Sequence, residues 1–224
     1  GMTISGLYFN SSSTYNVGLF GYISGGTIKN VGIVDSYFNG REDVGGLCGN
    51  NQGTISDCYF FGSVSGNNFV GGLCGEMCNG SLSSCYFVGT VSGSSYTGAV
   101  CGYIDRATIT NCFFNSDIFS GVAVEKNDGG TIKNVVAKTT KQFKSGEVAY
   151  QLNGDRDVWG QTINTNDYPI FGGSKVYATT GCVSYSNDPN HTGAVAHDFT
   201  HGTDGKCSNC GNYEEPVQDV NGVY

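Results

Sequence analysis

Short apolar runs recur along the first 138 residues of the chain, separated by Gly, Ser, Asn and Asp. Within each run apolar residues alternate with small or polar ones, as in Leu47-Cys48-Gly49 and Thr54-Ile55-Ser56. Alternation with a period of two predicts β-strands, and the separating residues are those that favour turns. Because no window here has the apolar spacing of a helix and glycine is frequent, we expect an all-β region.

The runs return with a fixed 27-residue period. Cys58, Cys85 and Cys112 follow one another at this interval, and Val31 lies one interval before them. Each unit holds three short strands, which predicts one coil of a three-sided β-solenoid whose coils stack about 4.8 Å apart. We therefore expect residues 1–138 to form a right-handed parallel β-solenoid of five to six coils.

The two central units share a longer string of residues. VGGLCG at 44–49 and again at 70–75 is followed each time by Cys-Tyr-Phe and then Val-Ser-Gly. These units resemble the GLUG motif repeat of bacterial cell-surface and secreted proteins, and the resemblance covers roughly residues 15–138. That family occurs in large proteins of gut-type bacteria, some of them called immunoglobulin A peptidases. The motif itself has no known chemistry, so the resemblance implies an extracellular or cell-surface location but no peptidase activity.

Six of the ten cysteines form two columns in the predicted stack. Cys48, Cys74 and Cys101 make one column, which continues as Phe20 and Val124; the other contains Cys58, Cys85 and Cys112, and continues as Val31 and Val135. A position that alternates between Cys, Val and Phe is an apolar core position, where Cys acts as a small hydrophobe. We favour buried free thiols in these columns, with pairing inside a column as the alternative.

The pattern changes at residue 139, and residues 139–180 are predicted to be a capping segment. Residues 140–154 are the one credible helix, with Phe143 and Leu152 on its apolar face. A helix at this place could cover the open end of the solenoid. Trp159 is expected to pack within the cap, with a ligand-binding role as the less favoured alternative.

A small Cys/His element is predicted at residues 181–216. Cys207 and Cys210 form a Cys-x-x-Cys knuckle, and Cys182 with His197 or His201 could complete a structural zinc site. A disulfide or free thiols are the alternatives, because one such knuckle is a weak signal. Residues 217–224 are typical of a linker to a further module of the same polypeptide.

Charge and side-chain placement argue against several functions. A net charge of −8 with only 11 Lys and Arg does not suit a nucleic-acid partner. No run of 18 apolar residues is present, so no membrane span is expected in this segment. The acidic candidates, among them Glu42, Asp43 and Asp105, form no 27-residue column, which disfavours a catalytic groove. We expect no enzyme here, although a polysaccharide-active β-solenoid enzyme is the rival hypothesis.

A row of aromatic residues is the strongest candidate for binding. Tyr96 follows Phe69 by one repeat interval, so their rings are expected to line one corner of the solenoid. Such a row could stack on a glycan, or it could simply pack the corner. We therefore predict an adhesin-like segment that binds a glycan or a host or cell-surface protein, with a purely structural stalk or spacer as the alternative.

Overall fold

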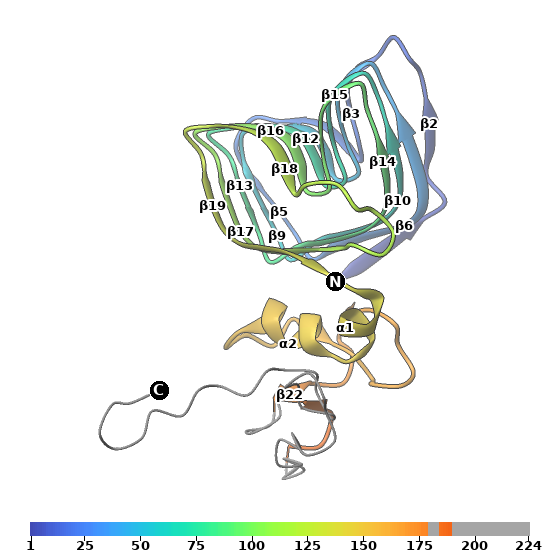
Figure 1. Ribbon diagram of the computed structural model, residues 1–224, viewed down its shortest axis with the longest axis vertical. Coiled ribbons are helices and arrows are strands. Elements are labelled where there is room, and N and C mark those ends of the chain that lie inside the picture. Colours follow the sequence, from blue (N-terminus) through green and yellow to red (C-terminus); the bar gives the residue numbers. More distant parts are fainter. Residues whose placement is uncertain (179–183, 190–224) are drawn as a thin grey trace, which may run out of the picture.

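The repeats form a parallel β-solenoid of about five turns, followed by a helical segment (Figure 1). The computed structural model describes residues 1–178 and 184–189. The solenoid expected from the 27-residue period is confirmed, since Tyr59 pairs with Tyr86 and Cys74 with Cys101 in the parallel ladders. Within the described ranges, no helix has the length and apolar character needed to cross a bilayer.

Three parallel sheets make up the solenoid. The ten-stranded sheet consists of β1 (Met2–Ser5), β2 (Tyr8–Asn10), β5 (Thr27–Lys29), β6 (Val31–Asn39), β9 (Thr54–Ser56), β10 (Tyr59–Ser65), β13 (Ser81–Ser83), β14 (Tyr86–Ser92), β17 (Thr108–Asn115) and β19 (Thr131–Lys138). The four-stranded sheet consists of β3 (Tyr15–Val17), β7 (Glu42–Gly45), β11 (Asn68–Gly71) and β15 (Ser95–Gly98). The five-stranded sheet consists of β4 (Phe20–Ile23), β8 (Cys48–Asn51), β12 (Cys74–Cys78), β16 (Cys101–Asp105) and β18 (Val124–Asp128).

A central coil has four strands where the sequence pattern indicated three. β7, β8, β9 and β10 follow one another in one coil, and the extra corner between β9 and β10 lies at Asp57, whose φ is +51°. The same corner recurs in the neighbouring coils at Asn30 and Ser84, with φ of +57° and +51°. Asn and Asp adopt this left-handed conformation more readily than most residues, so they can mark a corner that an apolar pattern does not reveal.

The cysteine columns lie inside the solenoid as free thiols, as expected. Cys48, Cys74 and Cys85 are fully buried. The Sγ of Cys48 donates to the carbonyl oxygen of Asn50 at 3.1 Å, and the Sγ of Cys85 donates to that of Ser83 at 3.1 Å. Each of these two donating thiols therefore both fills the core and satisfies its weak donor within its own coil.

The helical segment differs from the prediction in its shape. Two short helices, α1 (Thr140–Lys144) and α2 (Glu147–Asn153), replace the single helix expected over residues 140–154. Gly146 separates them with φ of +89°, a conformation that a helix interior does not allow. Two small antiparallel ladders follow, β20 (Trp159–Gly160) with β21 (Ile170–Phe171) and β22 (Tyr177–Ala178) with β23 (Tyr185–Ser186).

The position of this segment is also different from the prediction. The helices lie alongside the ten-stranded sheet rather than over the open end of the solenoid (Figure 1). Ile132 of the last coil is still 41% exposed, which agrees with an uncovered face there. The buried apolar side chains of the helices meet outward-facing aromatic residues of the sheet, and this contact forms a second core. Its buried members are Tyr59, Tyr86, Val88, Phe113, Phe143, Val148, Leu152 and Trp159.

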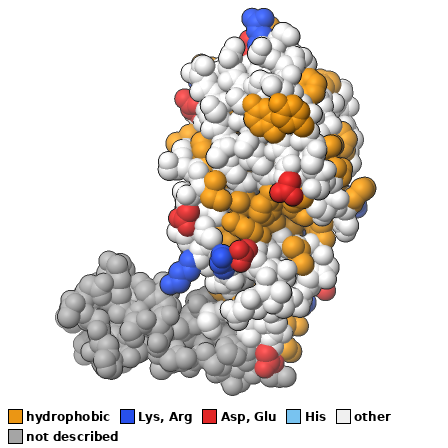
Figure 2. All heavy atoms as spheres, turned by 90° about the vertical axis from the view of Figure 1, so that its right-hand side faces the viewer, with side chains coloured by type: hydrophobic (Ala, Val, Ile, Leu, Met, Phe, Trp, Pro, Cys, Tyr) orange, Lys and Arg blue, Asp and Glu red, His pale blue; other side chains and the backbone are white. Residues whose placement is uncertain are grey.

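Polar contacts fix the helical segment to three different coils. Arg156 forms an ion pair with Asp57 at 2.8 Å, and the Tyr86 hydroxyl donates to the carbonyl oxygen of Pro169 at 2.5 Å. The amide of Asn111 donates to the carbonyl oxygen of Gln151 at 3.1 Å. Figure 2 shows hydrophobic side chains gathered at this junction, where an apolar hollow of about 280 Å³ lies beside Phe61.

Candidate binding site at the inner bend

The four-stranded and five-stranded sheets meet at a sharp bend inside each coil, here called the inner bend (Figure 1). A Cβ at Gly75 of β12 would collide with the backbone of Asp43 and Val44 in β7. Gly102 of β16 meets the backbone of Phe69 in the same way. The last glycine of each motif copy therefore lets the two sheets touch backbone to backbone, a contact that any side chain would block.

This contact decides which side chains become neighbours across the inner bend. Gly75 abuts Asp43, so the next residue, Glu76, lies beside the Asp43 carboxyl group. One coil further on, Gly102 abuts Phe69, and the ring of Tyr103 lies 5.3 Å from that of Phe69. Successive coils thus present a pair of carboxylates and then a pair of aromatic rings.

Phe69 and Tyr96 stack as the 27-residue spacing predicted. Their ring centroids are 5.3 Å apart with an interplanar angle of 8°. Tyr103 completes the group, with its centroid 6.3 Å from that of Tyr96. The Tyr103 hydroxyl donates to Asp128 at 3.1 Å, and this bond raises the pKa of Tyr103 to about 12. All three rings are partly exposed, so they form a surface rather than part of the core. Their binding role stays a prediction.

The backbone that carries these rings is strained. Asn16, Asp43, Phe69 and Tyr96 occupy one column, with φ of +54°, +53°, +52° and +49°. Asn and Asp tolerate this left-handed conformation, whereas for a bulky aromatic residue it is an outlier. Such a conformation costs roughly 1–3 kcal/mol per residue, and outliers of this kind cluster at functional sites.

The carboxylate pair has no basic partner among the described residues. Oδ1 of Asp43 is buried without a hydrogen bond. Burial, together with the charges of Glu76 and Glu42, raises the pKa of Asp43 to about 7. Glu76 accepts bonds from the amide of Asn50 and from the thiol of Cys78. Asn50 is 9% exposed, and its own Oδ1 is buried without a partner.

We expect Asp43→Asn to raise the melting temperature at pH 8 and to change it little at pH 4. The pKa of Asp43 is higher in the folded than in the unfolded state, so the native state binds more protons and stability falls as the pH rises from about 4 to 7. Asn already stands in this column at position 16. Thermal unfolding at both pH values measures the effect, and a lower melting temperature at pH 8 would contradict it.

Comparisons with known proteins agree with the repeat architecture. Residues 40–65 match the GLUG motif. The chain therefore contains a GLUG motif within its repeats. Halomucin of Haloquadratum walsbyi is 40% identical to it over 78 residues, which make up 34% of this chain. The chain spans about 1% of the length of that curated relative.

One solved structure has a related outline. It comes from Bacteroides ovatus and is provisionally named an immunoglobulin A1 protease. It is 17% identical to this chain, with a TM-score of 0.40, and the match covers 77% of this chain and 76% of that one.

Trp159, the third predicted ligand-binding residue, does not join Phe69 and Tyr96 at the inner bend. It is 1% exposed, and its ring lies 5.4 Å from that of Tyr86 and 4.7 Å from that of Phe171. The ligand-binding alternative for Trp159 is therefore wrong for this arrangement, because no face of the indole is open. The residue packs the helical segment against the sheet, which was the favoured interpretation.

The predicted zinc site cannot be placed. Cys182, His197, Cys207 and Cys210 all lie outside the described residues, as does the alternative ligand His201. Within residues 1–178 and 184–189, no group of three or more Cys, His, Asp or Glu side chains is arranged to hold a metal ion. Structural zinc stays a prediction from the Cys-x-x-Cys knuckle alone.

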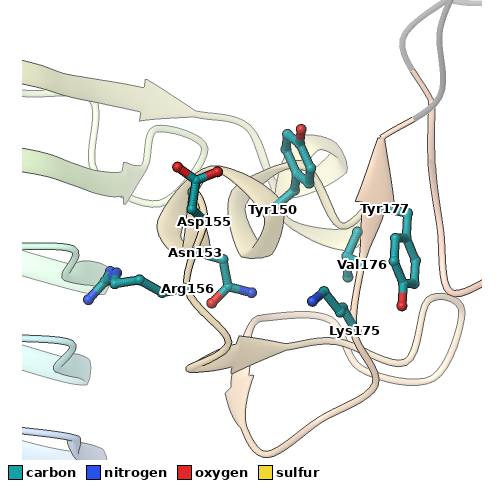
Figure 3. A pocket seen from close by; sticks show the side chains of 8 residues that line it. Tyr150, Asn153, Asp155, Arg156, Lys175, Val176 and Tyr177 are labelled. Atoms are coloured by element: carbon teal, nitrogen blue, oxygen red, sulfur yellow. The ribbon is translucent and has the colours of Figure 1, made fainter. Parts of the chain in front are cut away.

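A cavity of about 290 Å³ lies between α2 and the segment before β22 (Figure 3). Two of its polar side chains already have partners in the fold. The Asn153 amide oxygen accepts from the backbone of Val158 and Trp159, and Arg156 points away from the cavity toward its partner Asp57. These contacts stabilise the helical segment, so the inner bend is the better candidate for a site.

The sequence pattern did not reveal the partners of Phe69 and Asp43. Tyr103 and Glu76 belong to the other sheet, and no 27-residue column joins them to Phe69 or Asp43. The sequence signal that could have identified these partners is the residue directly after the last motif glycine. That residue is Asn50, Glu76 and then Tyr103 in successive copies.

Proposed function

We propose that this GLUG-motif chain is a non-catalytic, adhesin-like binding segment of a bacterial cell-surface or secreted protein. The GLUG motif and the repeat fold support an extracellular, cell-surface location. Further modules of the same polypeptide would place the solenoid at the surface. The ligand would be a glycan or a host or cell-surface protein that contacts the inner bend.

The strained aromatic column carries this proposal. A spacer needs only a backbone that turns at this column, and Asn16 and Asp43 show that polar residues achieve the turn. Phe69 and Tyr96 accept the same conformation at a cost of roughly 1–3 kcal/mol each. Two stacked, partly exposed rings then offer a flat π-face, which suits the apolar C–H face of a sugar ring.

Replacing both rings by asparagine tests the proposal. We expect Phe69→Asn with Tyr96→Asn to abolish binding to a glycan array while changing the free energy of unfolding by less than about 1 kcal/mol. The lost ring stacking, about 0.5–1.5 kcal/mol, is offset by relief of the left-handed strain. Urea denaturation checks the folding of the variant.

The alternative function, a purely structural stalk, predicts the opposite result. If the rings only pack the corner, the double variant loses stability and the wild-type chain binds no glycan. Thr90→Ala is a matched control, because Thr90 lies on the exposed outer face of β14 and should affect neither quantity. Wild-type glycan binding that survives in the double variant would contradict the assignment of the site to these rings.

A polysaccharide-active enzyme is the second candidate, and one observation favours it. Asp43, with a pKa near 7, lies beside Glu76, and pairs of carboxyl groups with different proton affinities serve glycoside hydrolysis. Release of reducing ends from a glycan that binds would favour the enzyme over the adhesin.

A further inference from the structure

We infer that the inner bend recognises an amino sugar, with the protonated amine between Asp43 and Glu76 and the sugar ring against Phe69. This inference rests on the proposed binding function and names its ligand class. It follows from the order of side chains along the bend, from the unpaired oxygens there and from the placement of the nearby basic residues.

The order of side chains matches a ligand with a cationic end and a flat body. The register of β7 with β11 places Asp43 one strand from Phe69, at the ladder spacing of about 4.8 Å. The carboxylate pair and the aromatic pair are therefore direct neighbours along the solenoid axis. An amine substituent and the ring that carries it are separated by a distance of the same order.

Two oxygen atoms at this place need a donor. Oδ1 of Asp43 and Oδ1 of Asn50 are buried without hydrogen bonds, and Asn50 is 9% exposed. The amide of Asn50 also bonds Glu76, so the unpartnered amide oxygen lies within the same group. An ammonium group supplies three donors and no acceptor, which complements two carboxylates and an amide oxygen.

Nearby basic side chains have other partners. Arg41 lies 3.7 Å from Glu42 and stacks over the ring of Tyr15. Lys126 pairs with Asp128 and Arg106 with Asp105, both at 2.7 Å. None of the ion pairs that the structure describes includes Asp43 or Glu76. The negative charge of this pair is thus left uncompensated by the described part of the chain.

An organic cation fits the bend better than a metal ion does. Calcium takes six to eight oxygen ligands, whereas the bend offers two carboxylates and one amide oxygen. The rings of Phe69 and Tyr103 attract an ammonium group by a cation–π interaction, and they give a metal ion no ligand. The aromatic neighbours therefore select an ammonium group carried on an apolar body.

The charge pair lowers the stability of the unliganded protein, because two like charges are partly buried together. A ligand cation that binds between them would remove this cost. The arrangement matches a general pattern, in which groups that destabilise a fold are kept where they contact a ligand.

Isothermal titration with two tetrasaccharides of the same backbone tests the inference. Fully deacetylated chitosan tetraose carries ammonium groups, whereas chitotetraose carries neutral N-acetyl groups. We expect the wild-type chain to bind the deacetylated sugar at least tenfold more tightly at pH 6.5, where many of its amines are protonated, a preference of about 1.4 kcal/mol. Asp43→Asn with Glu76→Gln should remove this preference and retain the residual binding of the neutral sugar.

Control variants separate this inference from the proposed function. Asp105→Asn removes a partly exposed carboxylate that pairs with Arg106, and it should keep the preference for the amine. Phe69→Asn with Tyr96→Asn should weaken both sugars alike. Equal wild-type affinity for the two sugars would overturn the inference but leave glycan binding intact.

Two further results would overturn the amino-sugar assignment. One is binding of a lysine-containing peptide, but not its acetyl-lysine form, without binding of chitosan tetraose, because the amine would then belong to a protein. The other is an absence of binding to chitosan tetraose. The proposed glycan-binding function would then be tested by the glycan array alone. A preference that survives Asp43→Asn with Glu76→Gln would place the amine site elsewhere.

Discussion

Gly75→Ala should lower the free energy of unfolding by about 3 kcal/mol or more. A Cβ at this position would collide with the backbone nitrogen of Val44 and the carbonyl carbon of Asp43. Backbone atoms cannot rotate away as a side chain can, so β7 and β12 would have to separate. Ladder pairing carries the displacement to the adjacent coils, which places this change among the severe core substitutions. Urea denaturation of the purified variant measures the loss.

Gly25→Ala is the matched control for this prediction. Gly25 has φ of +76°, and a Cβ there would meet no atom within 4 Å. Alanine at Gly25 should therefore cost about 1 kcal/mol from left-handed strain alone, and Gly25→Asn should cost less. Similar losses for Gly75→Ala and Gly25→Ala would show that close approach of the sheets is not what the motif glycine provides.

The solenoid should lose stability in alkaline solution, at pH values where its peptide bonds are still intact. Burial raises the pKa of the Cys48 thiol to about 12 and also raises the pKa of Cys74, Cys85 and Cys101. An unfolded cysteine has a pKa of about 8.5, so above that pH the unfolded chain releases protons that the native chain keeps. Stability then falls as the pH rises, by about 1.4 kcal/mol per pH unit for each thiol and about 5.6 kcal/mol per pH unit for the four.

Urea unfolding between pH 7 and pH 10, in the presence of a reducing agent, measures this slope. Cys101→Val supplies the control, because Val124 already occupies the next position in the same ladder. The variant should lose about a quarter of the slope above pH 9. A stability that stays constant from pH 8 to pH 10 would mean that the thiols are already ionised, or oxidised, in the native state.

The solenoid could be predicted from sequence because its rule is local and repeated. A 27-residue period with alternating apolar residues fixes both the strands and their register, and Leu82 pairs with Ile55 and Ile109 as that period requires. The extra corner at Asp57 was not foreseen, because a left-handed residue changes the direction of the chain without changing the apolar pattern.

The position of the helical segment depends on contacts that no period describes. Phe143 and Leu152 were recognised as one apolar face, but the surface that they cover was not. Tyr59 and Tyr86 point outward from the sheet, and such aromatic residues on a β-solenoid can be mistaken for exposed ones. Their neighbours in the fold are far away in the sequence, as the bond from Tyr86 to Pro169 shows.

Only the aromatic half of the candidate site could be predicted, because only its residues are separated by one repeat interval. Phe69 and Tyr96 stack within one ladder, so their separation by one repeat interval identified them. The carboxylate pair joins two sheets, and the separation of its members along the sequence corresponds to no multiple of the repeat. Only the backbone contact at Gly75 shows that Asp43 and Glu76 are neighbours.

The lateral helices also determine how the protein would carry a pulling force. If residue 139 simply left the last coil, tension on the following chain would peel the coils off one ladder at a time. Instead Arg156, Pro169 and Gln151 connect the segment to three coils, through Asp57, Tyr86 and Asn111. Tension applied beyond α2 would therefore load several coils at once in shear, a direction in which many hydrogen bonds must break together.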